Sequence, residues 1–362
     1  MIDPQAVDKI LDRARWAPSG DNTQPWRFER IDGDRFRIHA SDTRDWCVYD
    51  LEGRASQIAV GALLETIALA AGALSVEVHF EIEPDAPETH PIINVQLGSA
   101  PDAVPDPLQT VIEKRSTQRR PFSSKPLTAE HKAALEAAVG VDYRIVWIEG
   151  TTPKWRMARL LFRNAHIRLT IKEAYEVHKR IIEWDAQFSD DRIPDQALGL
   201  DALTIKSMRW AMASWQRVQF LNRWFAGTWL PRLQMDLLPG LGCAAHFFLV
   251  ADRKPDDVAG HIAAGRAVQR LWLACAVNDI QFQPEQTPII FAEYARKGTP
   301  FTDDQAALDE ATRLAANLNA VVGEANVTRA VFAGRVGYGA PAVARSLRLA
   351  LPLLSTKSSV KE

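Results

Sequence analysis

The segment PSGDNTQPW occupies residues 18–26, between an amphipathic helical pattern in residues 3–17 and the strand-like RFERI of residues 27–31. Ser19 and Gly20 can expose backbone amides at such a junction, and the side chains of Asn22 and Gln24 both donate and accept hydrogen bonds. A loop of this composition suits the polar edge of a planar heterocycle such as a flavin. The alternative interpretation is an ordinary capped turn in which Asn22 bonds to its own backbone.

The sequence on either side of this loop predicts a first α/β unit in residues 1–100. FRIHA, residues 36–40, is the hairpin partner of RFERI, with the turn at Gly33. Residues 53–71 are apolar nearly all round and include small residues, a composition typical of a helix buried in a core or an interface. Further strands are predicted at residues 75–82 and 92–97. The proline-rich residues 101–107 are predicted to be a linker.

The pattern then restarts, which predicts a second unit in residues 108–355. The helical pattern of residues 128–140 precedes the strand YRIVWIE, as the first helix precedes RFERI, and GRAVQRLWLACAV (265–277) matches the texture of GALLETIALAAGA (61–73). Repetition in the same order indicates an ancient duplication. The predicted fold class is therefore α+β, with two related α/β halves. Residues 153–240 are predicted to be a helical insertion without strands, and residues 356–362 a tail.

A second polar segment, KRSTQRRPF, occupies residues 114–122. In an extended chain alternate side chains point to one side, so Arg115, Thr117 and Arg119 converge while Lys114 and Arg120 face elsewhere. Two guanidinium groups and a hydroxyl are suited to a phosphate and a ribityl chain. The alternative interpretation is a solvated basic turn.

Together, the two segments resemble the FMN-dependent nitroreductase superfamily. Its members carry an R-x-[ST]-x-[RK] phosphate motif, matched by residues 115–119, and a P-S-x-x-N-x-Q-P-W flavin loop, matched by residues 18–26. The family's usual motif order is reversed here. Because family members are dimers whose flavin contacts both subunits, the resemblance implies the long fused branch, in which the two halves of one chain form a pseudo-dimer with a composite site.

The resemblance also implies the residues of the FMN site. QPEQTP, residues 283–288, corresponds to the family loop near flavin N5, although Gln286 replaces a glycine; on pattern alone it is a rigid loop between elements. Flavin N5 carries the chemistry, so no catalytic side chain is expected. The expected cofactor-binding residues are Pro18, Ser19, Gly20, Asn22, Gln24, Arg115, Ser116, Thr117, Arg119, Pro284, Glu285, Gln286, Arg345 and Arg348.

The implied function is an FMN-dependent oxidoreductase that transfers two electrons from NAD(P)H, or a similar donor, to a small electron-poor organic acceptor. One alternative is an FMN-sequestering or storage protein with a closed lid and no turnover. Another is a flavin-dependent dehydrogenase of a small ring or peptide-derived substrate. The insertion is expected to cover the flavin with Trp210, Trp215, Trp224 and Trp229.

Composition excludes several other classes. The 362 residues carry a net charge of −2, which gives no broad field for nucleic acid. Cys47, Cys243 and Cys275 form no disulfide framework or metal spacing, and no HExxH motif occurs, so no metal is expected. We expect a cytoplasmic protein, a monomeric pseudo-dimer or a homodimer. An amphipathic helix pair in residues 208–238 could dock on a membrane, but its arginines occur throughout rather than on one face, which makes membrane binding the weaker interpretation.

Overall fold

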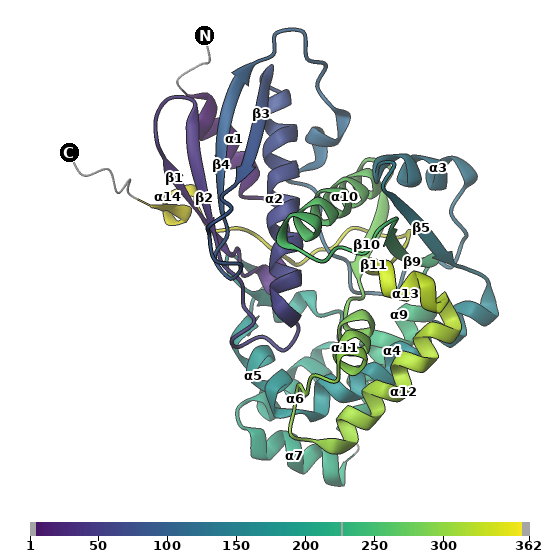
Figure 1. Ribbon diagram of the computed structural model, residues 1–362. Helices are drawn as coiled ribbons and strands as arrows, with labels where there is room; N and C mark the ends of the chain where they lie inside the picture. The colour runs from purple at the N-terminus through teal and green to yellow at the C-terminus, as the bar shows by residue number, and fades with distance from the viewer. Residues whose placement is uncertain (1–4, 226, 357–362) are drawn as a thin grey trace.

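The computed structural model describes residues 5–225 and 227–356, which fold as a mixed α/β molecule with two principal sheets (Figure 1). The first sheet has the order β13-β1-β2-β4-β3 and the second the order β10-β11-β9-β5. All neighbouring strands are antiparallel except β13, which is parallel to β1. The strands are β1 (Trp26–Arg30), β2 (Arg35–Ala40), β3 (Val76–Ile82), β4 (Ile92–Ser99), β5 (Tyr143–Ile148), β9 (Ala245–Ala251), β10 (Ile280–Pro284), β11 (Ala330–Tyr338) and β13 (Ser355–Thr356).

The two sheets have the same connectivity. In the first, α1 (Ala6–Ala14), β1, β2, α2 (Arg54–Gly72), β3 and β4 follow one another; in the second the corresponding elements are α3 (Ala129–Ala138), β5, β9, α10 (Val258–Val277), β10 and β11. Each element takes the equivalent place, because β1-β2-β4-β3 corresponds to β5-β9-β11-β10. The helices that the sequence pairs, residues 61–73 and 265–277, are therefore equivalent in topology.

Helices α2 and α10 pack against each other between the sheets, and their contact is reciprocal. A Cβ atom on Gly61 would lie 1.9 Å from the carbonyl oxygen of Ile262, and one on Gly265 would lie 2.1 Å from that of Ile58. Each glycine thus meets the residue three positions before the other. Only glycine allows backbones to approach so closely, which explains the small residues that mark both helices.

The insertion is mostly helical and forms the lower part of the molecule in Figure 1 together with α11 and α12. It also contains three two-residue strands, so the expectation that it has no strand is wrong: bridges this short leave no periodic signal in a sequence. Its elements are α4 (Thr151–Thr170), α5 (Lys172–Ile181), β6 (Ile182–Glu183), β7 (Phe188–Ser189), β8 (Ile193–Pro194), α6 (Ala202–Met212), α7 (Trp215–Trp224), α8 (Trp229–Arg232) and α9 (Leu238–Leu241).

Two further differences concern the second half. Residues 283–288, expected to be a loop, instead contain the end of β10 and the start of the unpredicted helix α11 (Thr287–Lys297), with Pro288 in its first turn. Helices α12 (Gln305–Val322) and α13 (Glu324–Arg329) follow. The C-terminal segment, with β12 (Arg345–Ser346) and α14 (Leu351–Leu354), then returns to the first sheet, where β13 extends β1. Most of the expected tail, residues 357–362, lies outside the described residues.

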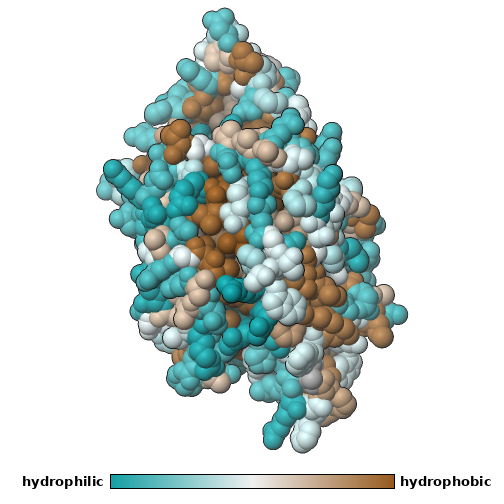
Figure 2. Space-filling view, turned by 90° about the vertical axis from the view of Figure 1, so that its right-hand side faces the viewer, coloured by the Kyte–Doolittle hydropathy of each residue, from teal (hydrophilic) through white to brown (hydrophobic). Residues whose placement is uncertain are grey.

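The surface is mixed in character. The face in Figure 2 is largely hydrophilic, with apolar side chains gathered in a strip in its upper half. Among the described residues, one helical segment, Leu51–Gly72, is long and apolar enough to cross a membrane, and 78% of its most apolar window is buried. This segment includes α2, so its apolar character is explained by its packing on α10.

Candidate functional site

The loop at residues 18–26 has a backbone conformation that side chains rarely adopt. Asp21, Asn22 and Gln24 have φ angles of 52°, 63° and 46°, in the left-handed region. Hydrogen bonds maintain this conformation: Ser19 Oγ accepts from Gln24 N at 3.0 Å, and Gln24 Nε2 donates to the Asn22 carbonyl at 3.1 Å. Non-glycine residues held in this region are concentrated at functional sites, because the surrounding structure has to enforce them.

Gln24 lies behind this loop. Its Nε2 also donates to the Asp190 carbonyl at 2.8 Å, and its Oε1 accepts from Leu349 N at 3.0 Å. The side chain is fully buried, so its hydrogen-bonding groups are used within the protein. Gln24 therefore joins the loop to the insertion and to the C-terminal segment. Unlike Pro18, Ser19 and Asn22, it does not line the cavity in front of the loop.

A polar cavity of about 70 Å³ lies in front of the loop. Most of its lining comes from three parts of the chain that are far apart in the sequence, namely the loop, residues 115–119 and the C-terminal segment, and Ile193 of the insertion and Trp272 of α10 complete it. Asn22 contributes a buried Oδ1 that has no hydrogen-bond partner, although its Nδ2 donates to the Arg192 carbonyl at 3.2 Å. The lining residues are Pro18, Ser19, Asp21, Asn22, Arg115, Ser116, Thr117, Arg119, Ile193, Trp272, Arg345, Ser346 and Arg348.

Arg115 is the most buried cation of this cavity. Its guanidinium carbon lies 4.5 Å from the centre of the Trp272 ring, and its Nη2 donates to the Trp16 carbonyl at 3.1 Å. Its Nε is buried and has no partner. Burial, together with the charges of Arg348 and Arg345, lowers the pKa of Arg115 well below its usual value. The surroundings thus disfavour the charged form in the absence of an anion.

Two cations from the C-terminal segment complete the cluster. Arg348 Nε donates to the Ala17 carbonyl at 2.9 Å, and burial together with Arg345 lowers the pKa of Arg348 to about 9. Arg345 Nη2 donates to the Glu113 carbonyl at 2.8 Å, while its Nε has no partner. Within residues 5–225 and 227–356, none of these three arginines forms an ion pair with a carboxylate. The cavity therefore holds a concentration of positive charge suited to a phosphate group.

A larger, mainly apolar cavity of about 330 Å³ adjoins the polar one. Small and apolar side chains of α2 form one wall, and Val268 and Trp272 of α10 form another. The two cavities have seven lining residues in common and therefore lie side by side. The shared residues are Pro18, Ser19, Asp21, Thr117, Arg119, Ile193 and Trp272.

Asp21 lies at the junction of the two cavities and was not among the expected site residues. Burial raises its pKa to about 6, against the opposing charge of Arg119. Burial in turn lowers the pKa of Arg119 to about 10, opposed by Asp21. Part of the Asp21 surface is open to the cavity. The feature of the sequence that could have indicated Asp21 is that it is the single carboxylate in the otherwise uncharged segment of residues 18–26.

The segment Pro284–Gln286 divides its residues between the cavity and the core. Pro284 and Gln286 line the apolar cavity. Glu285 is buried in the other direction, where it accepts from Arg335 Nη1 at 2.9 Å and lies 2.7 Å from His246 Nδ1. Arg335 also donates from Nη2 to the Arg119 carbonyl at 2.8 Å. Glu285 therefore acts through Arg335 on the backbone of the 115–119 segment and does not line the cavity with its neighbours.

The insertion covers the apolar cavity, but without its tryptophans. Aliphatic, methionine and basic side chains line the cavity from this side. They are Arg168, Leu169, His178, Ile181, Ile182, Ile193, Leu198, Met208 and Met235. Trp210, Trp224 and Trp229 are 48%, 66% and 61% exposed, and half-buried Trp215 packs on Tyr175. The expectation that these tryptophans cover the site is wrong, because helical spacing does not tell which face of a surface helix is turned inward.

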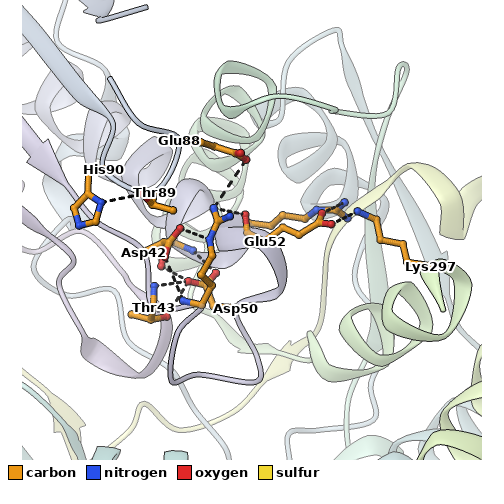
Figure 3. Close-up of polar contacts among 11 residues, drawn as sticks. Asp42, Thr43, Asp50, Glu52, Glu88, Thr89, His90 and Lys297 are labelled. Atoms are coloured by element: carbon orange, nitrogen blue, oxygen red, sulfur yellow. Dashed lines mark hydrogen bonds and ion pairs between the residues drawn. The ribbon is translucent and has the colours of Figure 1, made fainter. Parts of the chain in front are cut away.

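Figure 3 shows the polar contacts that hold the segment leading into α2. Asp50 accepts hydrogen bonds of 2.8 Å from both the backbone N and the Oγ1 of Thr43, and one of 2.6 Å from Ser56 Oγ. Glu52, in the left-handed region, pairs with Lys297 of α11. These contacts fix the N-terminal end of α2, which forms a wall of the apolar cavity.

Tyr49 lies in the same segment and faces the insertion. Its Oη is 3.0 Å from His178 Nε2. Burial raises the pKa of Tyr49 and lowers that of His178 to about 3, so both groups are neutral at pH 7. Tyr49 lines the apolar cavity and also a third cavity of about 350 Å³. The residues that these two cavities share are Tyr49, Ala55, Ile58, Gln286 and Ile290. Among the described residues, no cluster of three or more His, Cys, Asp and Glu side chains could hold a metal ion.

Comparisons with known proteins include a weak structural similarity to a flavoprotein. No family model matches the chain, and no curated protein matches it. Among solved structures, it is similar to the FMN-dependent nitroreductase NfnB from Mycobacterium smegmatis in complex with NADPH, with 17% identity, 68% of this chain and 95% of that chain covered, and a TM-score of 0.35. At that score the similarity carries no conclusion about this chain, and its function has to be inferred from its own residues.

Proposed function

We propose that the chain binds FMN, with the phosphate among Arg115, Arg345 and Arg348 and the ring system in the apolar cavity. The observation that carries this proposal is that two cavities, one small and cationic and the other larger and apolar, lie side by side and share seven lining residues. FMN has these two parts in one molecule. A phosphate dianion would also offset the burial and the mutual repulsion that lower the pKa of Arg115 and Arg348.

Buried atoms without partners support the same ligand. Arg115 Nε and Arg345 Nε are donors without acceptors, and Asn22 Oδ1 is an acceptor without a donor. Buried polar groups are normally paired, so each of these atoms calls for a partner. A phosphate would accept from the arginines, and a hydroxyl or ring N–H of a flavin would donate to Asn22.

The residues around the apolar cavity would control the chemistry of a bound flavin. When bound, FMN would supply two-electron transfer from NAD(P)H, or a similar donor, to a small electron-poor acceptor. Arg119 would provide positive charge beside the ring, and Asp21, whose pKa is about 6, can hold a proton on its carboxyl group at the junction. The apolar side chains of the insertion would exclude water.

We further propose that the two halves arose by duplication and that the site is composite. The identical strand connectivity and the reciprocal contact of Gly61 and Gly265 support this origin. The loop at residues 18–26 comes from the first half, whereas Arg115, Arg345 and Pro284 come from the second. A chain of this kind would build within one molecule a site between two related units.

The purified protein, reconstituted with FMN and freed of excess, tests this function under anaerobic conditions. We expect NADH or NADPH to bleach the flavin absorbance and a nitroaromatic or quinone acceptor to restore it. A flavin that bleaches only with dithionite would favour sequestration. Reduction by a cyclic dipeptide, but by neither nicotinamide, would favour the dehydrogenase. A chain that retains no FMN would contradict all three functions, namely the NAD(P)H-dependent oxidoreductase, the sequestering protein and the dehydrogenase.

A further inference from the structure

The aromatic side chains of the insertion that do not face the cavity lie on a protruding end of the molecule. Helix α7 is at the lowest point of Figure 1, away from both sheets, and buries none of its side chains. Phe220, Trp224 and Phe225 are 49%, 66% and 66% exposed. A surface helix normally buries an apolar stripe, so α7 contributes little to the core while presenting aromatic rings to the outside.

The same part of the chain is rich in positive charge. Residues 202–235 contain five basic residues and no Asp or Glu; the basic residues are Lys206, Arg209, Arg217, Arg223 and Arg232. Because the whole chain carries −2, the remainder carries −7. Arg209 pairs with Asp185 and Arg232 is buried, whereas Lys206, Arg217 and Arg223 are exposed and form no ion pair within the residues that the structure describes. These three cations would orient the segment toward an anionic surface.

Cations and rings alternate on the exposed side. The guanidinium carbon of Arg217 lies 4.9 Å from the ring centre of Trp210, and that of Arg223 lies 5.4 Å from the ring centre of Trp224. Neither arginine pairs with a carboxylate in the described part of the chain, whereas Arg209 pairs with Asp185. Neighbouring tryptophan and arginine side chains are suited to the interface of a lipid bilayer. There the rings insert between the lipid headgroups and the guanidinium groups bind the lipid phosphates.

We propose that this α7 surface, formed by Trp210, Arg217, Phe220, Arg223, Trp224 and Phe225, docks on an anionic lipid bilayer. The structure revises the sequence-based interpretation, because Phe220 and Trp224 of α7 are exposed together with both of its arginines, while Trp215 packs on Tyr175. A second copy of the chain is a poorer partner, since two such surfaces would face each other with the same charge. The proposal is independent of whether the cavity binds FMN.

Co-sedimentation of the full chain with lipid vesicles tests the proposal. We expect binding to phosphatidylcholine vesicles that contain phosphatidylserine at about one lipid in three to be at least ~10-fold tighter than to pure phosphatidylcholine, and to weaken with salt. Arg217→Glu/Arg223→Glu should lower the affinity for anionic vesicles by about 10-fold or more, since each charge near the surface contributes to attraction. Phe220→Ser/Trp224→Ser should lower it without removing the salt dependence.

Matched variants elsewhere on the surface provide the controls. Arg156→Glu/Arg253→Glu makes the same change of charge at two exposed arginines that form no ion pair among the described residues, and Trp155→Ser removes an exposed tryptophan of α4. Both should bind as the wild type does. Equal binding of the Arg217/Arg223 variant and the wild type would overturn the proposal, as would a failure of the wild type to bind anionic vesicles. A lipid-free dimer that Phe220→Ser/Trp224→Ser dissociates would assign the surface to self-association instead.

Discussion

Arg115 is the residue whose surroundings most clearly require a ligand. It is buried beside two other guanidinium groups, with one hydrogen bond to a carbonyl and an unpartnered Nε. We predict that Arg115→Ala weakens FMN binding by ~2 kcal/mol or more, the expected contribution of a charge-assisted hydrogen bond. Fluorescence titration of apoprotein with FMN measures this. The adjacent, exposed Lys114→Ala should bind normally; an equal loss in both variants would remove the special role of Arg115.

His246 links the pH dependence of stability to the site. Its ring nitrogens lie 2.7 Å from Glu285 Oε2 and 2.8 Å from the Gly240 carbonyl oxygen. Burial alone would lower its pKa, but Glu285 raises it to about 10. Because the folded-state pKa lies above the unfolded value, the stabilisation is complete below pH 6.5 and is lost as pH rises through 10. Urea unfolding from pH 6 to 10 should therefore show a steeper loss for the wild type than for His246→Gln; parallel curves would contradict this.

Sequence spacing indicates which side chains can lie on one side of the backbone, but not how deeply each is buried. Alternation predicts that Arg115, Thr117 and Arg119 lie together; all three line the polar cavity, but Ser116 between them lines it as well. Alternation could not show that Glu285 turns inward to His246, because that depends on a partner 39 residues away. Asp21 was overlooked because its positive φ and its pKa arise from the folded loop, and a non-glycine residue gives no sign of either.

At the scale of elements, the α2–α10 contact is the most demanding feature of the fold. We predict that Gly61→Ala destabilises the chain by about 2 kcal/mol or more, because the new Cβ would lie 1.9 Å from the Ile262 carbonyl oxygen and the helices would have to separate. Gly72→Ala in the same helix is the control, since its Cβ would meet nothing within 4 Å. It should be neutral or stabilising by up to ~1 kcal/mol. Similar unfolding midpoints for the two variants would contradict the packing.

Long elements with a regular pattern were predictable, and short or proline-marked ones were not. The buried helices at residues 53–71 and 265–277 were predictable because small and apolar residues occur on nearly all of their sides. Helix α11 was missed because Pro288 in its first turn resembles a loop signal, although proline is compatible with that position. The exposed α7 was predicted as a helix, but its orientation was not, since its rings and arginines have no burial pattern.

At the scale of the whole molecule, the site connects the two halves through ligands from both. FMN should therefore stabilise the molecule as a unit and raise its unfolding free energy by about 2.7 kcal/mol at a free concentration 100 times the Kd. Calorimetry should show a single transition that moves upward with FMN concentration. Two transitions of which FMN shifts only one would contradict a composite site.

Comparative titration of the apoprotein with FMN and riboflavin, followed by quenching of flavin fluorescence, tests the central claim most directly. The two ligands share the ring system and differ in the phosphate, so their difference in affinity reports on Arg115, Arg345 and Arg348 alone. We predict that FMN binds at least ~100-fold more tightly, as expected for several charge-assisted hydrogen bonds to a phosphate. Equal affinities, or no binding of FMN, would contradict the assignment of this cavity to FMN.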